Sequence, residues 1–177
     1  MDRIEDEHRN INELNGYSYR YVLSLPRVEP MEAYMLYHKN YWDFPLSGVC
    51  SFGGKRYFFR IAIEVSERMI DSFMDSYESV SEIIYVLEDL SEEDWEIEDE
   101  VHAKFTKYVG CHTEYDSDGK RAIGKVNEEA KEHKKFYDWH AGLDPSKKNL
   151  KGEPKFRIHA GNWSYGIEPE ENYKDSD

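Results

Sequence analysis

The chain has 177 residues, of which 23 are basic and 37 acidic, so its formal net charge is −14. A charge this negative opposes direct binding to nucleic acid or to an anionic membrane, and no apolar run is long enough to span a bilayer. A chain of this length can bury one core, which predicts a single domain over residues 1–167. With no secretory pattern and only two cysteines, Cys50 and Cys111, we expect a cytoplasmic protein with free thiols.

The first third of the chain predicts one helix and two strands. Ile4, Ile11 and Leu14 have helical spacing, which predicts a short helix over Arg3–Leu14. Apolar residues then alternate with polar ones over Tyr17–Leu25, as in a half-buried strand. Met31–Tyr37 carries apolar residues on both faces, which predicts a strand in the middle of a sheet.

The clearest local pattern in the chain is a hairpin around Gly53-Gly54. Alternating residues precede the two glycines and resume from Tyr57 to Glu64, and glycine adopts the positive φ angles of tight turns. Ser66 predicts the N-cap of a short helix that runs to about Tyr77. The apolar run Ile83–Leu87 predicts another strand.

Two amphipathic helices are predicted in the second half. Ser91 is a favourable N-cap for a helix that runs to Val109, and Val126–His140 has the spacing of a second helix. A loop over residues 144–155 and a short strand at Phe156–His159 follow. Residues 168–177 are polar and acidic, which predicts a disordered tail. The predicted fold is α+β, an antiparallel sheet of about five strands with two or three helices packed on one face.

An acidic run is the most unusual feature of the sequence. Like charges three and four residues apart destabilise a helix, so the run is either tolerated or used. A helical projection places Glu92, Glu93, Glu96 and Asp99 on the solvent face, where they predict a surface that binds a basic site on a protein partner. The run contains nine acidic residues and no basic one: Glu88, Asp89, Glu92, Glu93, Asp94, Glu96, Glu98, Asp99 and Glu100.

The charge is unevenly distributed along the chain. Residues 1–119 carry 11 basic and 26 acidic side chains, whereas residues 120–155 carry 10 basic and 6 acidic ones. A protein polarised in this way can form a homodimer or bind two partners, although the same pattern also serves solubility alone.

Aromatic residues suggest a second interface. The chain has 14 Tyr, 8 Phe and 4 Trp, and strand aromatics usually belong to the core. Tyr41, Trp42 and Phe44 lie in a predicted loop before the hairpin, and exposed Tyr and Trp side chains dominate binding hot spots.

Histidines are the candidate catalytic residues. His133 and His140 are two turns apart on the predicted stripe that faces the core, where one could act as a general base and the other orient it. The structural alternative is that both fill the edge of an amphipathic helix.

A transition-metal site is a weaker alternative. Glu98 and His102 are four residues apart on one helix, and Cys111 and His112 follow its end, but their spacing matches no zinc signature. The sequence therefore predicts neither a bound metal nor a cofactor.

Two functions remain open. The first is a non-enzymatic acidic interaction protein, in the limit a mimic of nucleic acid like the small phage-type inhibitors of DNA-processing enzymes. The second is a small hydrolase or transferase that uses His102, His112, His133 or His140 in a cleft. Convergence of these histidines on a concave pocket would favour the enzyme.

Overall fold

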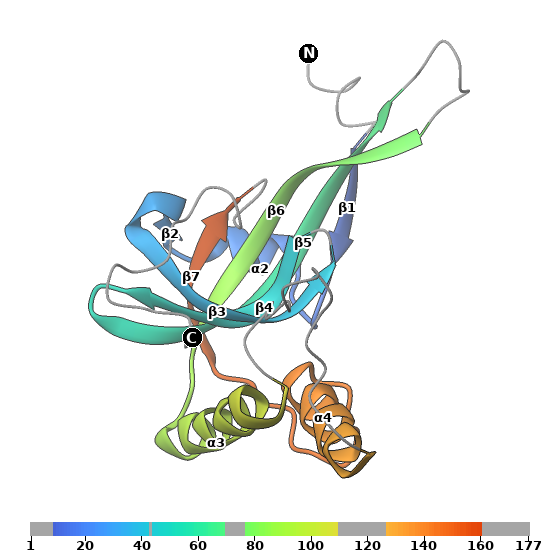
Figure 1. The fold of residues 1–177 in the computed structure, drawn as a ribbon. Helices are drawn as coiled ribbons and strands as arrows, with labels where there is room; N and C mark the ends of the chain where they lie inside the picture. The colour runs from blue at the N-terminus through green and yellow to red at the C-terminus, as the bar shows by residue number, and fades with distance from the viewer. Residues whose placement is uncertain (1–8, 43, 70–76, 110–126, 161–177) are drawn as a thin grey trace, which may run out of the picture. The chain divides into compact units, whose positions relative to one another are not determined.

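The computed structural model describes residues 9–42, 44–69, 77–109 and 127–160. Of residues 40–42, 44, 68, 69, 77–79 and 127–131 only the backbone course is described. These parts form an α+β fold with seven strands in one mixed sheet and three α-helices (Figure 1). The elements are β1 (Arg9–Glu13), α2 (Tyr19–Ser24), β2 (Arg27–Val28), the 3₁₀ turn η1 (Pro30–Glu32), β3 (Ala33–Trp42), β4 (Phe44–Phe52), β5 (Lys55–Met69), β6 (Tyr77–Asp89), α3 (Glu92–Tyr108), α4 (Asn127–His140) and β7 (Glu153–His159).

The sheet is not purely antiparallel, which corrects the sequence prediction. Its strand order is β2-β7-β6-β5-β4-β3, and β1 pairs with β5 outside this path. The short strand β2 runs parallel to β7, whereas all the other paired strands are antiparallel. β5 and β6, the two longest strands, form the central hairpin and pair from Phe58↔Glu88 to Met69↔Tyr77 (Figure 1).

Strand β6 is buried on both sides of the sheet. Its apolar run alternates between two core clusters: Ile83, Tyr85 and Leu87 belong to one, and Ile84 and Val86 belong to the other. The second cluster also contains Val22 and Leu25, so helix α2 covers this face. The prediction of a strand over Ile83–Leu87 is confirmed, and its continuous apolar character follows from this double burial.

The predicted hairpin at Gly53-Gly54 is also confirmed. Both glycines have positive φ, 60° and 78°, and the turn joins β4 to β5 in the register Phe52↔Lys55. By contrast, the predicted helix starting at Ser66 is wrong, because β5 continues through Ser66 to Met69. Ser66 is buried there between neighbouring strands.

Three predictions in the first third of the chain are wrong. Arg9–Glu13 forms strand β1 on β5 and not the end of a helix, while residues 1–8 lie outside the described part. Tyr19–Ser24 is the helix α2 and not a strand. The predicted central strand at Met31–Tyr37 corresponds to β3, which lies at an edge of the described sheet.

The two long helices and the last strand are confirmed. Helix α3 begins after Ser91, whose side chain accepts a hydrogen bond from the backbone N–H of Asp94, and its C-cap is Val109. Helix α4 and strand β7 match the predicted segments within a few residues. None of the helices described is long and apolar enough to cross a membrane.

The chain divides into two compact units. The first is the sheet with α2, within residues 1–89 and 152–170, and the second contains α3 and α4, within residues 90–151 and 171–177. The second unit is inserted between β6 and β7, which pair down to Asp89↔Glu153. The single domain over residues 1–167, the disordered tail and the packing of α3 and α4 on the sheet stay predictions.

Candidate functional site

Helix α3 presents the acidic residues that the sequence singled out. Glu92, Glu93, Glu96 and Asp99 are exposed, as is Glu100. Glu92, Glu93 and Asp94 occupy the first turn, where the partial positive charge of the helix N-terminus stabilises carboxylates. This placement offsets part of the repulsion within the run, so a stable helix can carry a dense row of negative charge.

Two members of the acidic run that lie on α3 do not face solvent. Asp94 and Glu98 are buried on the inner side of α3, with Val101 and Phe105. Asp94 accepts a hydrogen bond of 2.7 Å from Lys148, which follows α4, and this bond raises the pKa of Lys148. The run therefore combines an exposed acidic face with inward carboxylates that contribute to the helical unit.

The structure brings together His102 and His140, two of the four histidines that the enzyme alternative places in one cleft. Nδ1 of His102 on α3 lies 3.1 Å from Nε2 of His140 on α4. The ring centroids are 5.3 Å apart, so the rings meet nearly end-on, as in an N–H···N hydrogen bond. The ring of Phe105 stacks on that of His140 with centroids 3.9 Å apart.

Burial argues against a catalytic role for the His133 and His140 pair. His140 is only 1% exposed and is packed between the helices. His133 stacks on Tyr137, one turn later on the same helix, with ring centroids 6.2 Å apart. A general base has to reach a substrate proton within hydrogen-bonding distance, and a buried imidazole does not do so without opening of the helix pair.

The predicted metal candidates are only partly described. Glu98 and His102 lie one turn apart on α3 as expected, but Cys111 and His112 lie outside the described residues. Within residues 9–42, 44–69, 77–109 and 127–160, no three or more His, Cys, Asp or Glu side chains form a group that could hold a metal ion.

The aromatic segment around Trp42 is not an extended loop. Tyr41 and Trp42 end β3, Phe44 begins β4, and the two strands pair up to Trp42↔Phe44. The prediction of a loop is therefore wrong, because strand pairing continues to the tip of this hairpin. The exposure of these three side chains lies outside what the structure describes, so their role in binding stays a prediction.

A buried carboxylate in the sheet unit was missed by the sequence analysis. Glu88 on β6 is 0% exposed, and its Oε2 atom accepts a 2.5 Å hydrogen bond from the Tyr17 hydroxyl and lies 2.7 Å from Nε of Arg60. Its Oε1 atom accepts a 2.9 Å bond from the backbone N–H of Gly152. Burial, followed by the contact with Glu88, raises the pKa of Tyr17, so the phenol stays a donor.

One sequence signal could have identified Glu88. It continues the alternation of Ile84 and Val86, which places it on the buried face of β6 that α2 covers, where a charge needs a partner. The sequence prediction treated Glu88 only as a member of the acidic run, and the burial of Glu88 was therefore missed.

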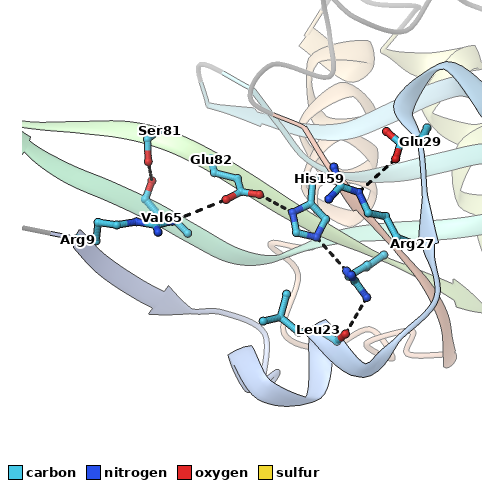
Figure 2. A network of polar contacts seen from close by, with 9 residues as sticks. Arg9, Leu23, Arg27, Glu29, Val65, Ser81, Glu82 and His159 are labelled. Atoms are coloured by element: carbon cyan, nitrogen blue, oxygen red, sulfur yellow. Dashed lines mark hydrogen bonds and ion pairs between the residues drawn. The ribbon is translucent and has the colours of Figure 1, made fainter. Parts of the chain in front are cut away.

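A second polar network joins strands of the sheet to the end of α2 (Figure 2). Nε of Arg157 donates to Nε2 of His159 at 2.9 Å, so the Nδ1 proton of His159 is directed at Glu82, which also pairs with Arg9. Nη1 of Arg157 donates to the carbonyl groups of Leu23, at 2.8 Å, and Leu25. The network thus joins β1, β6 and β7 to the end of α2, which indicates a structural role.

Comparisons of the chain with protein-family models, curated proteins and solved structures found no match.

Proposed function

We propose that this protein is a non-enzymatic interaction protein that binds a basic surface of a protein partner through the exposed face of α3. The observation that carries the proposal is the row of exposed carboxylates on one helix: Glu92, Glu93, Glu96, Asp99 and Glu100. Acidic surfaces steer basic partners into fast, salt-sensitive complexes.

The spacing of these carboxylates supports mimicry of a phosphate backbone. Glu92 and Glu100 are eight residues apart, about 12 Å along a helix at about 1.5 Å per residue. Five charges over this length have a mean spacing of about 3 Å, close to the about 3.4 Å per phosphate along one strand of DNA. The preferred partner is therefore a protein whose basic surface normally contacts DNA.

The alternative, a small hydrolase or transferase, has one observation in its favour. His102 and His140 converge, which is what a catalytic histidine pair requires. The burial of His140 weighs against it, because a substrate would have to separate α3 from α4 to reach this ring.

The test measures displacement of DNA from a basic protein. Fluorescently labelled duplex DNA is bound to a histone dimer, and the decrease in fluorescence anisotropy is followed as the acidic protein is added. We expect displacement at low salt that weakens as salt rises, since surface charges are screened over about 8 Å at physiological ionic strength. Reversing Glu92, Glu93, Glu96 and Asp99 to Lys should weaken displacement on the order of tenfold.

A matched pair of variants separates a specific surface from net charge. Glu92→Lys with Glu96→Lys changes the net charge as much as Glu29→Lys with Glu153→Lys, and all four side chains are exposed. Only the α3 variant should lose displacement, and circular dichroism should show that both keep their fold. Equal losses in the two variants, or an unchanged quadruple variant at low salt, would contradict the proposal.

A further inference from the structure

Opposite charges form a symmetric pattern along the outer side of α3. Residues spaced three and four apart share one stripe of a helix, and five charged residues follow this spacing: Glu93, Glu96, Glu100, Lys104 and Lys107. Lys104 is partly exposed and the other four side chains are exposed. The charged stripe is acidic up to Glu100 and basic after it. Glu96 and Lys104 are equally far from Glu100, and so are Glu93 and Lys107.

The two lysines of the charged stripe are directed at aromatic rings. Lys104 follows Glu100 by four residues, a spacing that permits an ion pair. Its Nζ atom instead lies 6.0 Å from the ring centroid of Tyr108 and 5.9 Å from that of Phe136 on α4. Nζ of Lys107 lies 5.1 Å from the centroid of Tyr108, whose ring stacks on Phe136 with centroids 4.9 Å apart. Both cations are therefore held near one aromatic pair at the C-terminal end of α3.

The charges of the stripe are not neutralised by neighbouring side chains. In the part of the chain that the structure describes, none of the five takes part in an ion pair. Lys148 donates its hydrogen bond to Asp94, which raises the pKa of Lys148, and Glu93 adds only a weaker attraction. The stripe can therefore pair with charges on another molecule. Lysines that already lie against rings also lose less freedom on binding.

We propose that α3 of one copy of this protein binds α3 of a second copy in antiparallel orientation, with Glu100 at the twofold axis. Glu93 then faces Lys107 of the second copy and Glu96 faces its Lys104, and the symmetry repeats both contacts. Four attractive contacts form against one repulsive contact between the two Glu100 side chains. A parallel pair of helices would instead place like charges opposite each other along the whole stripe.

This dimer does not depend on the proposed function. Exposed ion pairs contribute little, and each copy carries a net charge of −14, so association should be weak and depend on concentration. If both inferences hold, the second copy and a basic partner compete for Glu93 and Glu96.

A charge swap between two variants tests the pairing. The carboxylate-reversed variant carries Glu93→Lys and Glu96→Lys, and the lysine-reversed variant carries Lys104→Glu and Lys107→Glu. Neither should self-associate, because like charges then meet at all four contacts. Their mixture should form a dimer, since opposite charges meet at all four. The two variants together have the same formal charge as two wild-type chains, so net charge does not explain this result.

Fluorescence-detected sedimentation velocity measures the association. The labelled lysine-reversed variant is followed at physiological ionic strength, where charges are screened over about 8 Å, and the wild-type dimer should dissociate in about 1 M salt. Glu29→Lys with Glu153→Lys is the control, because it has the net charge of the carboxylate-reversed variant and both side chains are exposed. It should not bind the labelled chain, since attractive and repulsive contacts then balance.

Circular dichroism shows whether the variants keep their fold. If Lys104→Glu disturbs the contact with the aromatic rings and the variant unfolds, Lys107→Glu mixed with Glu93→Lys tests the outer contacts alone. Equal binding of the labelled chain to the control, or no association of the swapped variants, would overturn the proposal.

Glu100 tests the register of the two helices. Glu100→Gln removes only the repulsive contact on the axis, so it should tighten the wild-type dimer by up to about fivefold. Glu93→Gln changes the net charge equally but removes two attractive contacts, so it should weaken the dimer by about twofold to thirtyfold. A wild-type chain that stays monomeric at every concentration, or a shift in the same direction for both variants, would refute this antiparallel pairing.

Discussion

Replacing Glu88 with Ala should lower the free energy of unfolding of the sheet unit by about 3–5 kcal/mol, the usual cost of breaking a buried ion pair. The substitution leaves the Arg60 guanidinium, which is 11% exposed, without its carboxylate, and the Tyr17 hydroxyl and Gly152 N–H without their acceptor. Urea unfolding followed by circular dichroism measures the loss, and hydrogen exchange of β6 amides localises it.

The neighbouring residue provides a matched control for Glu88. Asp89 also pairs with a basic side chain, Lys55 at 2.8 Å, but both groups are partly exposed. Asp89→Ala should therefore have a much smaller effect, since surface ion pairs contribute little. In the double variant Glu88→Met with Arg60→Met, the loss should be smaller than the sum of the two single losses, because no buried charge remains. Similar losses for Glu88→Ala and Asp89→Ala would show that Glu88 is not a buried anchor.

Helix α2 shows why local patterns failed in the first third of the chain. The alternation of Tyr17, Tyr19, Tyr21, Leu23 and Leu25 predicted a strand, with Val22 as the exception. In the helix Val22 is 0% exposed and is the residue that packs in the core, while Ser18 accepts a hydrogen bond from the Tyr21 N–H as N-cap. Tyr17 and Tyr21, four residues apart, stack on each other with ring centroids 6.3 Å apart. The N-cap at Ser18 and the burial of Val22 therefore outweighed the alternation of apolar residues, which is typical of a strand.

Features set by local chemistry were predictable. The Gly53-Gly54 turn needs positive φ, and Ser91 caps α3, so both were visible in the sequence. The exposure of Glu92, Glu93, Glu96 and Asp99 follows from helical geometry once α3 is placed. The meeting of His102 with His140 was not predictable, because it depends on how α3 and α4 pack. The same holds for Glu88, because its partners are far away in sequence. They are Tyr17 just before α2, Arg60 on β5 and Gly152 just before β7.

Replacing Gly48 with Ala should destabilise the sheet unit by about 3 kcal/mol or more, at the upper end of the range for overpacked cores. A Cβ atom at this position would lie 2.2 Å from the backbone oxygen of Tyr37 and 2.7 Å from the ring of Phe59. Phe59 has no room to move, since it is 0% exposed and packs edge-on against Tyr85, whose hydroxyl donates to the Pro45 carbonyl at 2.6 Å. Urea unfolding measures the effect: the urea concentration at the midpoint should fall while the slope of the transition stays constant.

Two further variants test whether the effect comes from the clash with the backbone of β3. One isolates backbone strain at a positive φ angle, and the other removes the ring of Phe59. Gly53→Ala meets no atom within 4 Å but keeps a φ of 60°, so it should cost only the roughly 1–2 kcal/mol of a left-handed alanine. Adding Phe59→Leu to Gly48→Ala should not restore stability, because the Tyr37 oxygen belongs to the backbone of the neighbouring strand β3, where His38 pairs with Gly48. If Gly48→Ala unfolds at the wild-type midpoint, or if Phe59→Leu rescues it fully, the close approach of β3 to β4 is not what requires glycine at this position.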